Sequence, residues 1–222
     1  MASPNNLVGK AAVLYEKNLA AKALLSFAPG GAALHELLLE RGNQIVGERT
    51  EAFFDGLGAG TIALTEELIQ SNDFLHCYFK TLKAAQQTRK KEKIELLASM
   101  LRGAIQSSEI DFDQYEELLD VLDEMSLREI MALQMLRRHE VASRTSIWET
   151  EHAQITSYWK SFRSDAITSL GLEEKEFDPF IARLVRTGFY KENTESFYDD
   201  TPKVGVTTRQ FERLVGLIEQ HQ

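Results

Sequence analysis

The apolar residues that follow Lys91 recur with the spacing of one helical face, and this repeat limits the fold more than any other feature of the chain. They occupy relative positions i, i+3, i+4, i+7, i+10 and i+11: Ile94, Leu97, Ala98, Leu101, Ala104 and Ile105. Side chains with this spacing lie on one side of an α-helix, and that side must be buried against a neighbouring element. We therefore expect a core helix here.

The same period returns in the segments on either side. Residues 113–125 place an apolar set on one face and an acidic set on the other; the apolar set is Tyr115, Leu118, Leu119, Leu122 and Met125. Ser126 and Glu129 have the spacing of a capping box, which predicts a helix beginning at Leu127. Further helices are predicted over residues 6–27, 32–54 and 155–170. The chain is therefore expected to be mainly α, with a helical bundle over residues 1–146.

After about residue 170 the pattern changes to short elements. Asp178 precedes a proline and is expected to cap a helix over residues 179–187 that ends at Gly188. The runs Phe189-Tyr190 and Val204-Gly205-Val206 predict a small β-hairpin. Thr207 with Gln210 fits a second capping box, which would open a final helix. Residues 147–222 are therefore expected to form a separate C-terminal module.

This order of elements resembles the winged-helix module of bacterial regulators. The resemblance rests on FDPFIARLVRTGFY at 177–190 and VTTRQFERLVGLIE at 206–219, within the last third of the chain. In that family the short helix before the glycine reads the DNA major groove, and the hairpin, or wing, touches phosphate. The resemblance implies that Arg183 and Arg186 face bases or phosphates and that Lys191 lies at the base of the wing.

The charge distribution departs from a DNA-binding wing. The segment between the two runs carries Glu192, Glu195, Asp199 and Asp200 against Lys191 and Lys203. The whole chain has 34 acidic and 25 basic residues and a net charge of −9. Phosphate repels such a segment, whereas winged-helix folds also serve as protein-interaction modules. We therefore expect a regulatory protein that acts through protein contacts, with sequence-specific DNA binding as the alternative.

A basic run precedes the striped helix. Arg89, Lys90, Lys91 and Lys93 are candidate contacts for an anion or an acidic partner, although such a run is also typical of an exposed helix start. The acidic face at 111–124 is its electrostatic opposite. Complementary charged patches steer protein encounters, and exposed apolar helix stripes supply the interface that we expect for a homodimer. An unidentified protein partner is also expected.

The residues that carry catalysis or bind metals do not form a recognisable set. The sequence contains no GxSxG, P-loop or GxGxxG motif, and no pair of cysteines that could hold zinc. His35 and Glu36 lack the second histidine of a zinc-protease helix, because Leu39 occupies its place. The sequence predicts a non-enzymatic protein that holds no metal and no cofactor.

The single cysteine, Cys77, lies in an apolar stretch and reads as a core residue. A chain without a cysteine pair suits a reducing cytoplasm, and no apolar run is long enough to span a bilayer. We therefore expect a soluble cytoplasmic protein of bacterial type. A third reading is a membrane-acting effector whose helical hairpin at residues 7–54 inserts into a lipid surface.

Overall fold

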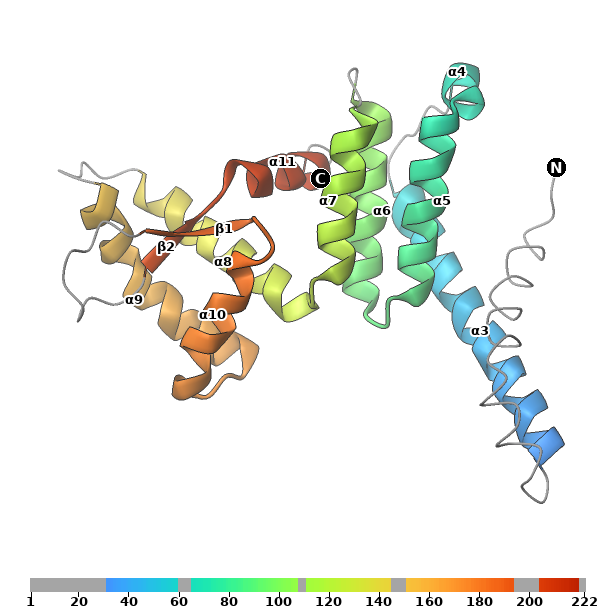
Figure 1. Cartoon of the computed structure of the whole chain (residues 1–222), viewed down its shortest axis with the longest axis horizontal. Coiled ribbons are helices and arrows are strands. Elements are labelled where there is room, and N and C mark those ends of the chain that lie inside the picture. Colours follow the sequence, from blue (N-terminus) through green and yellow to red (C-terminus); the bar gives the residue numbers. More distant parts are fainter. Residues whose placement is uncertain (1–30, 60–64, 108–110, 145–150, 194–203, 220–222) are drawn as a thin grey trace. The chain divides into compact units, whose positions relative to one another are not determined.

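The structure is a computed structural model of the chain, and it describes residues 31–59, 65–107, 111–144, 151–193 and 204–219. These residues form a mainly helical fold with a small C-terminal β-hairpin followed by a helix, which confirms the coarse architecture predicted from the sequence (Figure 1). The expected helix over 6–27 and the acidic part of the wing at 194–203 lie outside the described residues.

The chain divides into two compact units, Met1–Ala98 and Ser99–Gln222. This division falls inside one helix, α6 (Lys91–Gln106). The sequence led us to expect a boundary between residues 146 and 147 instead. The boundary between residues 146 and 147 is a prediction about which parts of the chain fold independently, and it stays a prediction.

In the first unit, α3 (Gly31–Gly58) packs along α5 (Asn72–Gln87). Gln86 joins the two helices through both its backbone and its side chain. Its backbone oxygen accepts a hydrogen bond from Arg49 Nη1 (2.7 Å), and its side-chain nitrogen donates to Thr50 Oγ1 (3.1 Å). Phe53 is buried on α3. The helix predicted over 32–54 is confirmed, and it continues to Gly58.

Side-chain caps start the two helices that follow. Thr65 Oγ1 accepts from the backbone N–H of Leu68 (3.3 Å) and begins α4 (Glu66–Gln70). Ser71 Oγ accepts from the N–H of Phe74 (3.2 Å) and begins α5. Cys77 is buried on α5, as the sequence predicted.

The stripes predicted in the middle of the chain are buried. Every apolar residue singled out between Ile94 and Ile105 on α6 lies in the core, and so does the corresponding set of α7 (Phe112–Glu124). The capping box before α8 (Leu127–Ser143) is present, with Ser126 N–H donating to Glu129 Oε2 at 2.8 Å and Glu129 N–H donating to Ser126 Oγ at 3.3 Å.

The C-terminal half of the second unit contains four helical elements and the hairpin. They are α9 (Glu151–Leu170), the short 3-10 helix η1 (Glu174–Glu176), α10 (Phe177–Val185), β1 (Tyr190–Asn193), β2 (Val204–Thr207) and α11 (Arg209–Glu219). The strands are antiparallel, with Tyr190 opposite Thr207. The hairpin packs against α8 and α9 through β2, and against α10 through β1 (Figure 1).

Two caps differ from those predicted in this region. Asp178 was expected to cap α10, but α10 begins at Phe177, because the Glu173–Glu176 capping box of η1 leads directly into it. Thr207 was expected to cap the last helix, but Thr208 does so, accepting from the N–H of Phe211 at 3.4 Å. Thr207 instead binds a carboxylate of α8, described below.

The second unit also contains one very close helix contact. A Cβ atom placed on Gly103 of α6 would lie 1.9 Å from the backbone oxygen of Leu217 on α11. Only glycine permits this approach, since real Cβ atoms do not come so near to an oxygen. Among the described helices, none is both long and apolar enough to cross a membrane.

Candidate functional site

The start of α8 and the end of α10 are joined by an ion pair. Arg186 Nη2 donates to Glu129 Oε1 at 3.1 Å, and the Glu129 side chain is only 3% exposed whereas that of Arg186 is 50% exposed. The other Glu129 oxygen accepts from the backbone and the hydroxyl of Ser126. One carboxylate therefore both caps α8 and holds the end of α10.

Opposing effects act on the Glu129 carboxyl. Burial alone would raise its pKa, but hydrogen bonds from Ser126 and Arg186, together with the Arg186 charge, bring the pKa below its usual value. Glu129 is therefore an ionised carboxylate at neutral pH. A buried carboxylate of this kind depends on its partners, since its removal from water is costly.

Two further arginines meet at the ring of Phe180, which is buried on α10. The guanidinium carbon of Arg183 lies 5.1 Å from the ring centroid, and that of Arg128, from the first turn of α8, lies 5.9 Å from it. Both distances suit cation–π attraction. Three arginines from two helices thus lie at one junction.

Two apolar side chains are exposed on the same two helices. Met131 follows Arg128 by three positions on α8 and is 37% exposed, while Val185 precedes Arg186 on α10 and is 46% exposed. Residues three apart on a helix are neighbours on its surface. We call this set the α8–α10 surface; it consists of Arg128, Met131, Arg183, Val185 and Arg186.

The sequence predicted part of this surface. It named Arg183 and Arg186, both of which are exposed, but it gave no partner for either. It missed Arg128, and it recognised Glu129 only as a helix cap. The capping-box spacing revealed one half of the role of Glu129, whereas a contact across 57 positions leaves no local signal.

The other candidate residues lie away from this junction. Lys191 is exposed on β1, opposite Val206. At the other end of α10, Asp178 accepts from Arg163 Nη1 at 2.8 Å, and Glu174 accepts from Arg163 Nε at 3.0 Å. The amino-terminal end of α10, the end that would approach DNA bases in a winged-helix protein, therefore carries acidic groups.

The basic run in the first unit does not form one uniform surface. Arg89 and Lys90 are exposed. Lys91 Nζ lies 3.6 Å from Oε1 of Glu95, which is one turn further along α6. Lys93 is buried. The four residues named from the sequence therefore include three on the surface and one in the core.

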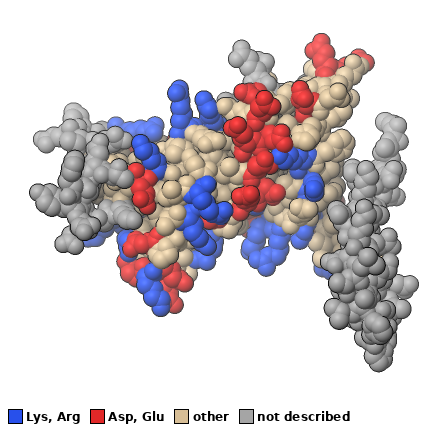
Figure 2. Space-filling model, viewed as in Figure 1, with Lys and Arg blue, Asp and Glu red and all other residues tan. Residues whose placement is uncertain are grey.

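Acidic side chains gather along α7 in the second unit (Figure 2). The exposed members of this face are Asp113, Glu117, Asp120, Asp123 and Glu124. Figure 2 also shows a separate group of basic side chains beside this acidic band. The exposed side of α7 is thus an acidic face of the second unit.

A second buried carboxylate fixes the hairpin to α8. Glu140 Oε1 accepts from the backbone N–H of Thr207 at 2.6 Å, and Oε2 accepts from the Thr207 hydroxyl at 2.5 Å. Burial raises the pKa of Glu140, although the Thr207 hydrogen bonds and the charge of Arg144 oppose this. Glu140 thus binds β2 through both of its oxygens.

The described His139 side chain contacts a carboxylate of the neighbouring helix. His139 Nε2 lies 3.0 Å from Asp165 Oδ2, an ordinary contact between α8 and α9. Within the described part of the chain, no group of three or more His, Cys, Asp and Glu side chains is arranged to hold a metal ion. The side chains of His35, His152 and His221 lie outside the description.

Comparison with protein-family models, with curated proteins and with solved structures gives no match to this chain.

Proposed function

We propose that this protein is a non-enzymatic interaction module and that the α8–α10 surface is its principal contact with a protein partner. The observation that carries the proposal is the combination of exposed Met131 and Val185 with arginines held in place by Phe180 and Glu129. Methionine and arginine are enriched in protein interfaces, and arginines fixed in advance lose less side-chain freedom on binding.

A partner with acidic and apolar groups would complement this surface. The arginines attract carboxylates, and the two apolar side chains offer area that becomes buried on contact. The acidic face of α7 lies in the same unit and discourages strongly anionic polymers. We propose that the C-terminal part is a winged-helix-like module used for protein contact and that residues 1–146 include a helical bundle.

The test is recovery of bound proteins with matched variants of the full chain. Arg128→Glu with Arg183→Glu reverses two charges of the α8–α10 surface, while Arg138→Glu changes another exposed arginine of α8 outside that surface. The proposal requires that a partner retained by the wild type and by the Arg138 variant is lost from the double variant. Equal retention by all three chains would contradict it.

Sequence-specific DNA binding is the second candidate, because the same three arginines meet beside the α10–hairpin segment. It predicts that the wild type retains a few defined genomic fragments with a steep dependence on salt, and that Arg183→Ala abolishes this. No retention at low salt would remove this candidate. Loss of a protein partner without DNA retention would separate the two functions.

A homodimer is part of the proposal and is tested separately. Light scattering of the wild type at low and high salt measures the oligomeric state. A dimer that dissociates as salt increases would support pairing of opposite charges, since salt screens exposed charges. A monomer at every salt concentration would remove the dimer from the proposal.

A further inference from the structure

A polar pocket lies in the second unit, away from the α8–α10 surface. It has a volume of about 360 Å³ and is bounded by the end of α8, the start of α9, β2 and the start of α11. Its charged lining residues are Glu140, Arg144, Arg209 and Glu212. Small-molecule sites are usually concave regions of comparable size with a few polar groups that converge on the ligand.

The two carboxylates of this pocket already have partners. Both oxygens of Glu140 accept hydrogen bonds from Thr207. Glu212 accepts from Arg137 Nε, with N–O distances of 3.2 and 3.1 Å. These negative charges are therefore engaged by the protein itself and are poorly placed to attract a cation.

The two arginines of the pocket are in the opposite situation. Arg144 and Arg209 are both exposed, and neither makes an ion pair with any residue that the structure describes. The charge of Arg144 acts on Glu140 across the pocket wall. The guanidinium groups thus supply the charge that remains available for a ligand.

The backbone adds positive potential at the same place. Thr208 caps α11 and Arg209 is its first residue, and both line the pocket. The Thr208 hydroxyl takes one N–H of this turn, that of Phe211, and the positive end of the helix dipole still favours anions. Two uncharged hydrogen-bond donors of the pocket already have acceptors within the protein. Gln154 donates to Ser143, and the Thr208 hydroxyl donates to the backbone oxygen of Gly188.

We propose that this pocket binds a phosphate group, with Arg144 and Arg209 as its charged contacts and the first turn of α11 beneath it. Phosphate suits the site because its several oxygens accept from two guanidinium groups at once. Its ligand is a small phosphorylated molecule rather than a polymer, because the carboxylates of Glu140 and Glu212 form part of the same wall. A bound ligand would touch β2 and hence the hairpin.

The experiment is a titration of the full-length, isotope-labelled protein with inorganic phosphate, followed by amide NMR signals. The expected result is saturable change at amides of β2 and the start of α11. Arg144→Ala and Arg209→Ala should each weaken binding by about tenfold or more, the loss typical of a charge-assisted contact. The control is Arg213→Ala, an exposed arginine on the next turn of α11 that does not line the pocket.

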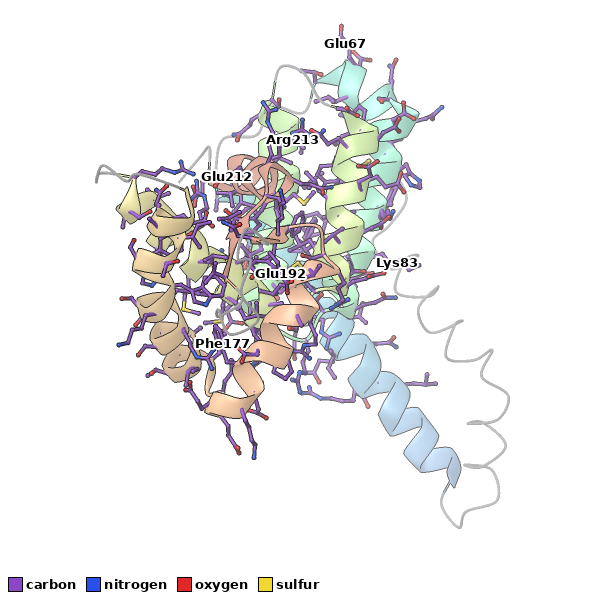
Figure 3. The ribbon with its side chains drawn as sticks, turned by 60° about the vertical axis from the view of Figure 1, so that its left-hand side comes forward. Glu67, Lys83, Phe177, Glu192, Glu212 and Arg213 are labelled. Atoms are coloured by element: carbon purple, nitrogen blue, oxygen red, sulfur yellow. The ribbon has the colours of Figure 1, made fainter. Side chains whose placement is uncertain are left out.

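Figure 3 labels Arg213 and its neighbour Glu212 on α11; Glu212 lines the pocket and Arg213 does not, which makes Arg213 a suitable control. Because both pocket arginines are exposed, we expect their variants to keep the wild-type circular dichroism spectrum. No saturable response to phosphate in the wild type would overturn the proposal. Equal weakening by all three arginine variants would also overturn it, since this would mean general attraction to charge.

The source of the phosphate group is distinguished in a second set of titrations. A mononucleotide and a short single-stranded oligonucleotide are compared with inorganic phosphate at equal ionic strength. Tighter binding of the mononucleotide, lost in the pocket variants, would support a small phosphorylated ligand. Binding of the oligonucleotide alone, with a steep salt dependence, would identify a nucleic-acid backbone and overturn the small-ligand assignment.

Discussion

The ring of Tyr190 occupies the space beside Gly205 in which any other residue would place its Cβ atom. That atom would lie 2.3 Å from both Cζ and the hydroxyl oxygen of Tyr190. The two residues come from opposite strands of the hairpin, and Tyr190 is only 2% exposed. Tyr190 anchors β1 in the core, and Gly205 leaves room for it on β2 because glycine has no side chain.

Gly205→Ala is therefore expected to destabilise the fold by about 1–3 kcal/mol, the range for overfilling a packed interior. Urea unfolding followed by circular dichroism measures this. Tyr190→Phe is the companion variant, because the buried Tyr190 hydroxyl has no hydrogen-bond partner among the described residues. Its removal should leave stability unchanged or raise it by up to about 1 kcal/mol. A large loss in the Phe variant would show that the hydroxyl has a partner.

Glu140 should make the stability of the fold depend on pH. Burial raises its pKa, so the folded chain holds this proton more tightly than the unfolded chain. The stabilisation is complete below the unfolded pKa and is lost as the pH rises through the folded pKa. Glu140→Gln removes the titration while keeping an acceptor for the Thr207 N–H, so its advantage over the wild type should grow as the pH rises.

Urea unfolding at a series of increasing pH values, starting near the ordinary carboxyl pKa of about 4, measures this difference. Glu117→Gln, an exposed change on α7, is the control. Parallel wild-type and Glu140→Gln curves would contradict the expectation.

Glu129 should change the stability of the fold at acid pH. Its pKa is lowered by hydrogen bonds that overcome the effect of burial, so its contribution is present above the unfolded pKa and is lost as the pH falls through the folded pKa. Arg186→Ala removes one of those hydrogen bonds. It should cost about 1–2 kcal/mol at neutral pH, less than a fully buried pair, because Arg186 is half exposed.

Acid unfolding of Arg186→Ala should therefore occur at a higher pH than that of the wild type. Arg183→Ala is the matched variant on the same helix, since Arg183 contacts Phe180 and no carboxylate in the described structure. Its acid transition should match the wild type. A shared shift in both variants would mean that the effect comes from net charge.

Gly103 and Gly216 form a matched pair of helical glycines. A methyl group on Gly103 would collide with the backbone oxygen of Leu217, whereas nothing lies within 4 Å of the corresponding position on Gly216. Gly103→Ala should destabilise by about 2 kcal/mol or more. Gly216→Ala should stabilise by about 0.5–1 kcal/mol, because alanine is the better helix former. Thermal unfolding of both variants measures the contrast.

The sequence predicted those parts of the fold that depend on local spacing. The stripe of α6, the apolar face of α7 and the Ser126–Glu129 box are each defined within a few turns of one helix, so periodicity was enough to find them. The two wrong caps, Asp178 and Thr207, show the limit of this reasoning. Each side chain fits a local motif, but each is bound by a residue from another helix.

The candidate site was predictable to a smaller extent. Arg183 and Arg186 were found through the resemblance of their segment to a winged helix, whereas Arg128 and the phosphate pocket come from elements far apart in sequence. Arg144 and Arg209 are separated by more than sixty positions, and only the packing of β2 against α8 and α9 brings the pocket walls together. No local pattern encodes such a meeting.

The double use of the Glu129 carboxylate has a mechanical consequence. The first turn of α8 and the last turn of α10 share a single ionised group, so neither can loosen without weakening the other. A partner that draws Arg186 outward would remove the counter-charge of the carboxylate that binds Ser126, where the chain passes from α7 to α8. A change at the end of α10 is thereby linked to the bend between α7 and α8, which lies more than fifty residues earlier in the chain.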